Sequence, residues 1–314
     1  MPSAQRYADS TRLFSPRIWV QQTTSREPEM DSSAVTAREA AEVAAANASG
    51  RQPVVFVHGL WLLAESWDRW RERFEAEGYA AIAVDWPGDQ ASYEAEHAHP
   101  DSLAGTSVPD VADHVQAVIA GLDKKPIVIG HSFGGLLVQI IAGRGLAAGT
   151  VSIDPAPSYG VLPLPITTLK ASLPVLGNPL NFGRTVTLTF EQFRYGFANA
   201  VPEAEARELY ATFHTPAPGR PLFQAGTANL NPWAKTKAAK DRSDRGPMLI
   251  ITGGSDNIVP FALASAAYKK QRKNAHHVTE LVEIPDAGHS LVIDSRWSEV
   301  ADAALDFLKR NSLA

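Results

Sequence analysis

The sequence of 314 residues contains no cysteine. The protein therefore has no disulfide, no thiolate nucleophile and no thiolate metal site. It also has no apolar run of the length that a membrane-spanning helix needs. Its 29 Lys and Arg are outnumbered by 34 Asp and Glu, for a net charge of -5, so no excess of positive charge attracts nucleic acid. We predict no membrane span and no nucleic-acid partner, and the oligomeric state stays open.

The beginning of the chain is polar. Its first thirty residues have no unbroken apolar region before a small-residue cleavage site, so we predict no signal peptide and a cytoplasmic location. Residues 1–50 are interpreted as a peripheral N-terminal segment that ends in a short Ala-rich helix before Gly50. A lid or a partner-binding arm is the alternative.

From Pro53 onward, short apolar runs alternate with amphipathic stretches, and no internal repeat is apparent. The stretches 65–79 and 108–122 place apolar residues at helical spacing. This alternation predicts an α/β fold with a mostly parallel sheet flanked by helices. The predicted strands are 53–58, 80–86, 126–131, 149–155, 247–254 and 279–285.

One interval between predicted strands, residues 156–245, is too long for an ordinary loop. Its first part is rich in proline, which argues against long regular elements there, while 190–201 and 203–213 have helical patterns. We predict an inserted, mostly helical cap at 156–245, lying over the carboxyl edge of the sheet. The core then consists of 51–155 and 246–314.

The segment Gly130-His131-Ser132-Phe133-Gly134 has the pattern G-x-S-x-G between an apolar strand and a helix. This context is typical of a nucleophile elbow, in which a strained turn projects a serine above the sheet. The amide of Phe133, at the helix start, would point to where negative charge develops on an attacked carbonyl.

A serine nucleophile needs a base and an acid that orients the base. Asp256 follows the strand 247–254 and His289 follows 279–285, in the chain order Ser, Asp, His. We predict Ser132, His289 and Asp256 as catalytic residues. Asp154, just after the strand 149–155, is the rival for the acid.

In the stretch "VFVHGLW", the predicted strand 53–58 leads into a loop at His58-Gly59. The next amide of this loop, that of Leu60, can donate to an oxyanion. Together with "DWPG" (85–88), "GHSFGG" (130–135), "GGSDNIVP" (253–260) and "GHS" (288–290), this stretch makes the chain resemble the α/β-hydrolase superfamily over about residues 53–311. The resemblance implies the α/β-hydrolase fold, the same three catalytic residues, and an oxyanion hole formed by the amides of Leu60 and Phe133.

Several residues are candidates for the substrate pocket. Trp61 and His131 are our pocket predictions, and His58 is expected to shape the oxyanion loop. Further aromatic residues fit either a pocket or plain core: Trp86, Phe193, Tyr195, Phe197, Phe223 and Trp233. The segment "EHAHPD" (96–101) has the residue types of a metal site, but we interpret it as a solvated loop.

These observations predict a serine hydrolase without cofactor or metal. Its substrate would be a small-molecule carboxylic ester, or a lactone or thioester, of small to medium size and hydrophobic character. C–C hydrolysis, acyl transfer and perhydrolysis use the same three residues. A ligand receptor on the same fold, with no or slow hydrolysis, is the alternative from another class.

Overall fold

The computed structural model describes residues 34–231 and 233–313, which belong to one compact unit, Ser32–Ala314. A six-stranded sheet forms where the sequence has its short apolar runs, which confirms the six predicted strands. They are β1 (Pro53–Val57), β2 (Ala80–Val84), β3 (Ile127–His131), β4 (Gly149–Ile153), β7 (Met248–Gly253) and β8 (Thr279–Ile284).

The strands pair in the order β2-β1-β3-β4-β7-β8, and every pair is parallel. All residues of β1, β3, β4 and β7 are buried, as expected for parallel strands covered on both faces. Because all strands point the same way, the loops after β3, β4, β7 and β8 meet at one edge of the sheet. Ser132, Asp154, Asp256 and His289 follow these four strands.

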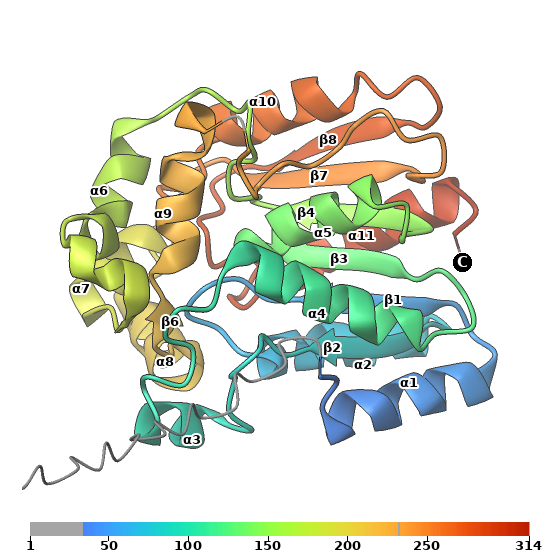
Figure 1. Cartoon of the computed structure of the whole chain (residues 1–314), viewed down its shortest axis with the longest axis horizontal. Coiled ribbons are helices and arrows are strands. Elements are labelled where there is room, and N and C mark those ends of the chain that lie inside the picture. The colour runs from blue at the N-terminus through green and yellow to red at the C-terminus, as the bar shows by residue number, and fades with distance from the viewer. Residues whose placement is uncertain (1–33, 232, 314) are drawn as a thin grey trace, which may run out of the picture. The chain divides into compact units, whose positions relative to one another are not determined.

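Helices cover both faces of the sheet (Figure 1). Those outside the interval 156–245 are α1 (Ala37–Ser49), the 3₁₀ helix η1 (Ala64–Trp67), α2 (Asp68–Ala76), α3 (Tyr93–Ala98), α4 (Val108–Ala120), α5 (Phe133–Gly143), α10 (Phe261–Gln271) and α11 (Trp297–Arg310). Helices α4 and α5 contact each other on one face, and α2 and α11 contact each other on the opposite face. Among the described residues, no helix is long and apolar enough to cross a membrane.

The helix predicted before Gly50 is present as α1. It begins with a capping box of Thr36 and Glu39 and ends at Gly50 in the left-handed conformation, φ 64°. Glu39 is fully buried and accepts hydrogen bonds from Nε2 of His114 at 2.9 Å and from the amide of Asp85 at 3.0 Å. These contacts join α1 to the core. Residues 1–33, on which the signal-peptide prediction rests, lie outside the described residues.

Between β4 and β7 the chain is mostly helical. It forms α6 (Ile166–Leu176), η2 (Pro179–Gly183), β5 (Thr185–Val186), α7 (Phe190–Gly196), α8 (Glu203–Phe213), β6 (Ala217–Pro218), α9 (Arg220–Gly226) and η3 (Ala228–Leu230). Helices α6 to α9 lie together beyond one end of the sheet, at the left of Figure 1. The prolines do not prevent α6, because Pro174 lies near its end and removes only one backbone donor. The boundaries of the N-terminal segment, core and cap stay predictions.

The interpretation of residues 96–101 as a solvated loop is confirmed in part: His97, His99 and Asp101 are exposed, but Glu96 is buried, and the first three residues are helical. Helix α3 includes Glu96 and His97. Glu96 is fully buried and accepts hydrogen bonds from the amide of Gln90 and the hydroxyl of Ser102. Nε2 of His97 lies 3.0 Å from the carbonyl of His214. Glu96 therefore holds the loop after β2 in place, which a pattern of alternating His and acid does not reveal.

Candidate active site

Ser132 occupies a tight turn between β3 and α5. Its φ is 56°, which a residue other than glycine rarely adopts. The turn requires close approach of the backbone: a Cβ on Gly130 would lie 2.2 Å from the carbonyl oxygen of Gly134, and one on Gly134 would lie 2.0 Å from that of Val57. Only glycine fits at these two positions, and the strain at Ser132 is of the kind that concentrates at functional sites.

Phe133 begins helix α5. Its amide, like the others of the first turn, has no acceptor within the helix, and the helix dipole places partial positive charge there. The amide of Ser132 is already used, because it donates to the carbonyl of Ile153 at 2.9 Å. The turn thus leaves the Phe133 amide as the donor closest in sequence to the serine.

His289 and Asp256 form a buried pair. Nδ1 of His289 lies 2.6 Å from Oδ2 of Asp256, and both side chains are fully buried. The other oxygen of Asp256 accepts the amides of Ile258 at 2.6 Å and Val259 at 2.9 Å, which fixes the carboxylate. Nε2 of His289 has no hydrogen-bond partner among the described residues. The pair therefore holds an imidazole whose Nε2 is available to take a proton.

Asp154, the rival acid, has a different environment. Its Oδ1 accepts the amide of Gly253 at 2.9 Å, while its Oδ2 has no partner in the described part of the chain. Burial, followed by the charge of Asp256, raises the pKa of Asp154 well above its usual value. The raised pKa favours the neutral form of Asp154, and Nδ1 of His289 pairs with Asp256.

His58 and Asp89 fix the loop after β1. Nδ1 of His58 lies 2.8 Å from the carbonyl oxygen of Gly59, and Nε2 lies 2.9 Å from Oδ2 of Asp89. A carbonyl and a carboxylate both accept, so the ring makes both bonds only as the doubly protonated imidazolium. Burial alone would lower the pKa of His58, but the charge and hydrogen bond of Asp89 raise it overall.

This pair also orients the peptide between Gly59 and Leu60. The carbonyl of Gly59 points to the His58 ring, and in a trans peptide the N–H lies on the opposite side of the C–N bond. The Leu60 amide therefore points away from the ring. A Cβ on Gly59 would lie 2.8 Å from Cβ of Ser132, so the loop and the serine are in close contact.

Trp61 joins this loop to the interval between β4 and β7. It has a φ of 64° and is buried. Its Nε1 donates to the carbonyl of Val186 at 2.9 Å, and its ring packs edge-on against Phe197 at 5.9 Å. The Phe197 ring in turn lies edge-on to His289 at 4.9 Å. Among the other aromatic candidates, Trp86 and Phe193 are core residues and Trp233 is 80% exposed.

His131 is fully buried next to the catalytic candidates. Its ring is 4.5 Å from that of His289, and neither of its nitrogens has a partner among the described residues. Burial and the neighbouring His289 hold its pKa well below the usual value, so the ring is neutral. One ligand atom each from His131, Asp154 and His289 lies within 4.8 Å of the others. These side chains are of types that can hold a metal ion. That the enzyme uses no metal therefore stays a prediction.

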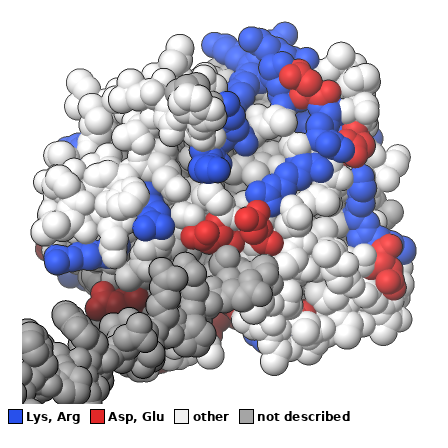
Figure 2. All heavy atoms as spheres, in the orientation of Figure 1, with Lys and Arg blue, Asp and Glu red and all other residues white. Residues whose placement is uncertain are grey.

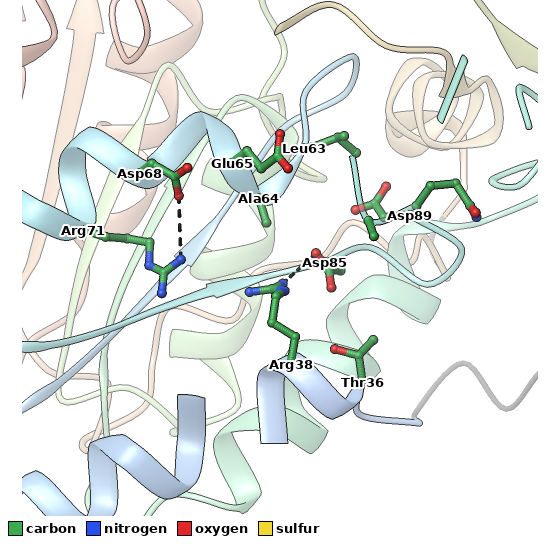
Figure 3. Close-up of a pocket in the computed structure, with 11 residues that line it drawn as sticks. Thr36, Arg38, Leu63, Ala64, Glu65, Asp68, Arg71, Asp85 and Asp89 are labelled. Carbon is green, nitrogen blue, oxygen red and sulfur yellow. Dashed lines mark ion pairs between the residues drawn. The ribbon is translucent and has the colours of Figure 1, made fainter. Parts of the chain in front are cut away.

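A separate cavity of about 250 Å³ has several charged side chains in its lining (Figure 3). Asp89 lines it, together with the ion pair of Arg38 and Asp85 at 2.6 Å. Ser132 does not line it. Sequence reasoning missed Asp89, although it directly follows the "DWPG" segment that carried the resemblance.

Comparisons with known proteins show the family of the chain. The sequence model of the alpha/beta hydrolase family matches residues 54–303. The chain belongs to this family. The alpha/beta hydrolase is 27% identical to a non-heme chloroperoxidase of Burkholderia pyrrocinia over 71% of this chain and 81% of that protein. It is also 27% identical to a non-heme haloperoxidase of Rhodococcus erythropolis, over 77% of this chain and 88% of that protein.

Solved structures share the fold of this alpha/beta hydrolase. One is a monoacylglycerol lipase of Paleococcus ferrophilus, with a TM-score of 0.57 and 22% sequence identity. The similarity covers 82% of this chain and 93% of the lipase. The predicted fold class is confirmed by the family match and by the parallel sheet.

Proposed function

We propose that this alpha/beta hydrolase cleaves carboxylic esters with Ser132 as nucleophile, His289 as general base and Asp256 as the orienting acid. The observation that carries the proposal is the buried 2.6 Å contact between Nδ1 of His289 and Oδ2 of Asp256, at the sheet edge where the strained turn presents Ser132. A serine hydroxyl is a weak nucleophile by itself, and this arrangement is the one that activates it.

In the first step, Oγ of Ser132 attacks the ester carbonyl while Nε2 of His289 takes its proton. The oxyanion collapses, the C–O bond to the alcohol breaks, and His289 returns the proton to the leaving alkoxide. Water then attacks the acyl-enzyme with His289 again as base, which releases the acid and restores Ser132. Asp256 holds the imidazole with Nδ1–H inward and stabilises its positive charge.

The amides of Phe133 and Leu60 are proposed to bind the oxyanion. The first is at the start of α5, where the helix dipole adds to the stabilisation. The second is oriented through the imidazolium of His58, which holds the Gly59 carbonyl. The positive charge of His58 lies beside this loop and favours negative charge on the carbonyl oxygen of the substrate.

The aromatic rings near His289 support a hydrophobic substrate. The rings of Phe197 and Trp61 lie within packing distance of each other, and Phe197 also touches His289. Such rings favour an apolar acyl or alcohol group by burial of apolar surface. We therefore expect faster hydrolysis of butyrate to octanoate esters than of acetate.

The test is hydrolysis of p-nitrophenyl esters of increasing acyl length by the wild type, by Ser132→Ala and by Asp256→Asn. We expect Ser132→Ala to lower kcat about 10⁴-fold or more, and Asp256→Asn about 10⁴-fold. Ser295→Ala, at an exposed serine, is the matched control and should keep full activity.

A fluorophosphonate probe with peptide mapping separates the possible failures. Label on Ser132 without turnover of any ester would mean that the site serves another acyl reaction. No label and no turnover would contradict the proposal and favour a ligand receptor, which thermal stabilisation by ligand without product release would then reveal.

Perhydrolysis is the second candidate, because the two relatives named above are a non-heme chloroperoxidase and a non-heme haloperoxidase. Here hydrogen peroxide replaces water in attacking the acyl-enzyme, so that a peracid leaves and Ser132 regains its proton. Halogenation of a reporter by bromide, hydrogen peroxide and acetate, lost in Ser132→Ala, would support this candidate. Halogenation that is equal in both proteins would contradict it.

A further inference from the structure

A set of large apolar side chains is exposed in the interval between β4 and β7. We call this set the apolar cap face. Six of its residues are 60% to 86% exposed: Leu164, Ile166, Leu173, Leu180, Leu230 and Trp233. Single exposed apolar residues are normal on a protein surface, but so many in one region mark an interaction site.

These residues come from segments that contact one another. The segment before α6 is joined to η3 by two hydrogen bonds: the amide of Gly160 to Oδ1 of Asn229 and Nδ2 of Asn229 to the carbonyl of Val161, each 2.7 Å. Helix α6 contacts η2 and α9, and α9 contacts η3. Figure 2 shows that the side of the molecule that carries α6 and α7 in Figure 1 is mostly uncharged, with blue basic side chains around it and red acidic ones at its lower margin.

The charged residues of the same segments all have one sign. No Asp or Glu occurs in 155–190 or in 209–240. The two segments carry instead Lys170, Arg184, Arg220, Lys235, Lys237 and Lys240, of which Lys240 pairs with Asp241. In a protein with a net charge of -5, this is a local reversal of charge. A hydrophobic surface with basic residues around it is the pattern that binds anionic lipid.

We propose that the apolar cap face docks onto the surface of an anionic phospholipid bilayer. The exposed Leu, Ile and Trp side chains enter the boundary between headgroups and acyl chains, and the Lys and Arg side chains contact the lipid phosphates. A second copy of the chain is a poorer occupant, because pairing two such faces brings like charges together. Docking requires no reaction at Ser132 and is independent of the proposed function.

The test is co-sedimentation of the full chain with vesicles of phosphatidylcholine alone and of phosphatidylcholine mixed with phosphatidylglycerol. We expect binding to the mixed vesicles, much weaker binding to phosphatidylcholine, and a decrease with added salt. The variants Ile166→Asp and Leu230→Asp should each reduce binding about tenfold or more. Val278→Asp is the matched control, since Val278 is also exposed, at 45%, but precedes β8 at the opposite end of the strands; it should bind as the wild type does.

Three results would overturn the proposal. The first is a wild type that stays in solution with the mixed vesicles. The second is equal loss of binding in Val278→Asp. The third is a wild type that does not bind vesicles but forms a dimer without lipid, as measured by light scattering, when the substitution Ile166→Asp dissociates this dimer. Thermal unfolding of each variant, read together with esterase activity, checks that the protein is folded.

Discussion

Replacing Asp89 by Asn should convert His58 from an imidazolium into a neutral ring. The change keeps the size of the side chain and one oxygen acceptor but removes the charge that raises the pKa of His58. A neutral imidazole has a single N–H, so it can no longer donate to both Gly59 and residue 89. The peptide that carries the Leu60 amide then loses part of its orientation.

The expected magnitude follows from the burial of the pair, whose two side chains are 2% and 1% exposed. Removing one partner of a buried pair costs about 3–5 kcal/mol, and a hydrogen bond to a charged group contributes about 1.5–3 kcal/mol. Because Asn retains an acceptor, we expect a loss of about 2–3 kcal/mol in the free energy of unfolding. We expect kcat to fall about 10- to 100-fold, less than the ~10²–10³ of deleting an oxyanion donor.

The pH dependence provides a sharper criterion. The folded state raises the pKa of His58 above 6.5, so the stabilisation is complete below about pH 6.5 and is lost as pH rises through the folded pKa. In Asp89→Asn, burial keeps the ring neutral, so protonation favours the unfolded chain at low pH. The difference between wild type and variant should therefore be larger at about pH 5.5 than at about pH 8.5.

The assay is urea unfolding across this pH range, with ¹⁵N spectra of the histidine ring and ester hydrolysis. Asp306→Asn, at an exposed aspartate in α11, is the control and should match the wild type. A stability difference that does not change with pH, or a His58 ring that is neutral in the wild type below about pH 6, would refute the imidazolium.

Asp154→Asn should be more stable than the wild type, because the raised pKa of the buried Asp154 means that the folded wild type must keep this acid protonated. The difference in the free energy of unfolding should grow with pH above 3.8, by up to about 1.4 kcal/mol per pH unit. Urea unfolding from acid to neutral pH measures this difference, and a difference that does not change with pH would argue against a neutral Asp154. Gly134→Ala should fail to accumulate as folded protein, since its Cβ would meet the carbonyl of Val57, whereas Gly183→Ala, which meets nothing within 4 Å, should fold normally; circular dichroism distinguishes them. Arg245→Met should lower the free energy of unfolding by about 3 kcal/mol, because the buried guanidinium donates to several backbone carbonyls. Burial lowers the pKa of Arg245 to about 10. The esterase activity of the folded fraction should stay unchanged, and a fall in this activity together with stability would contradict a purely structural role.

Local patterns in the sequence were sufficient for much of the fold. Apolar runs of strand length predict the four inner strands β1, β3, β4 and β7, since a strand covered on both faces must be apolar throughout. The edge strands β2 and β8 are predicted as well, although β8 includes Glu280 and Glu283 and is only partly buried. G-x-S-x-G predicts the turn at Ser132, because only glycine permits the close backbone contacts around it. Parallel strands also bring the loops that carry Asp256 and His289 to one edge without any knowledge of contacts.

The tertiary structure decided what depends on distance between remote residues. The preference of His289 for Asp256 over Asp154 rests on a 2.6 Å contact. The sequence does not decide between the two acids, because they follow neighbouring strands of the sheet. The partnership of His58 with Asp89 spans 31 positions and has no periodic signal. The exposure of Ile166 and Leu230 is likewise a tertiary result, because an apolar residue in a sequence predicts burial until the packing around it is known.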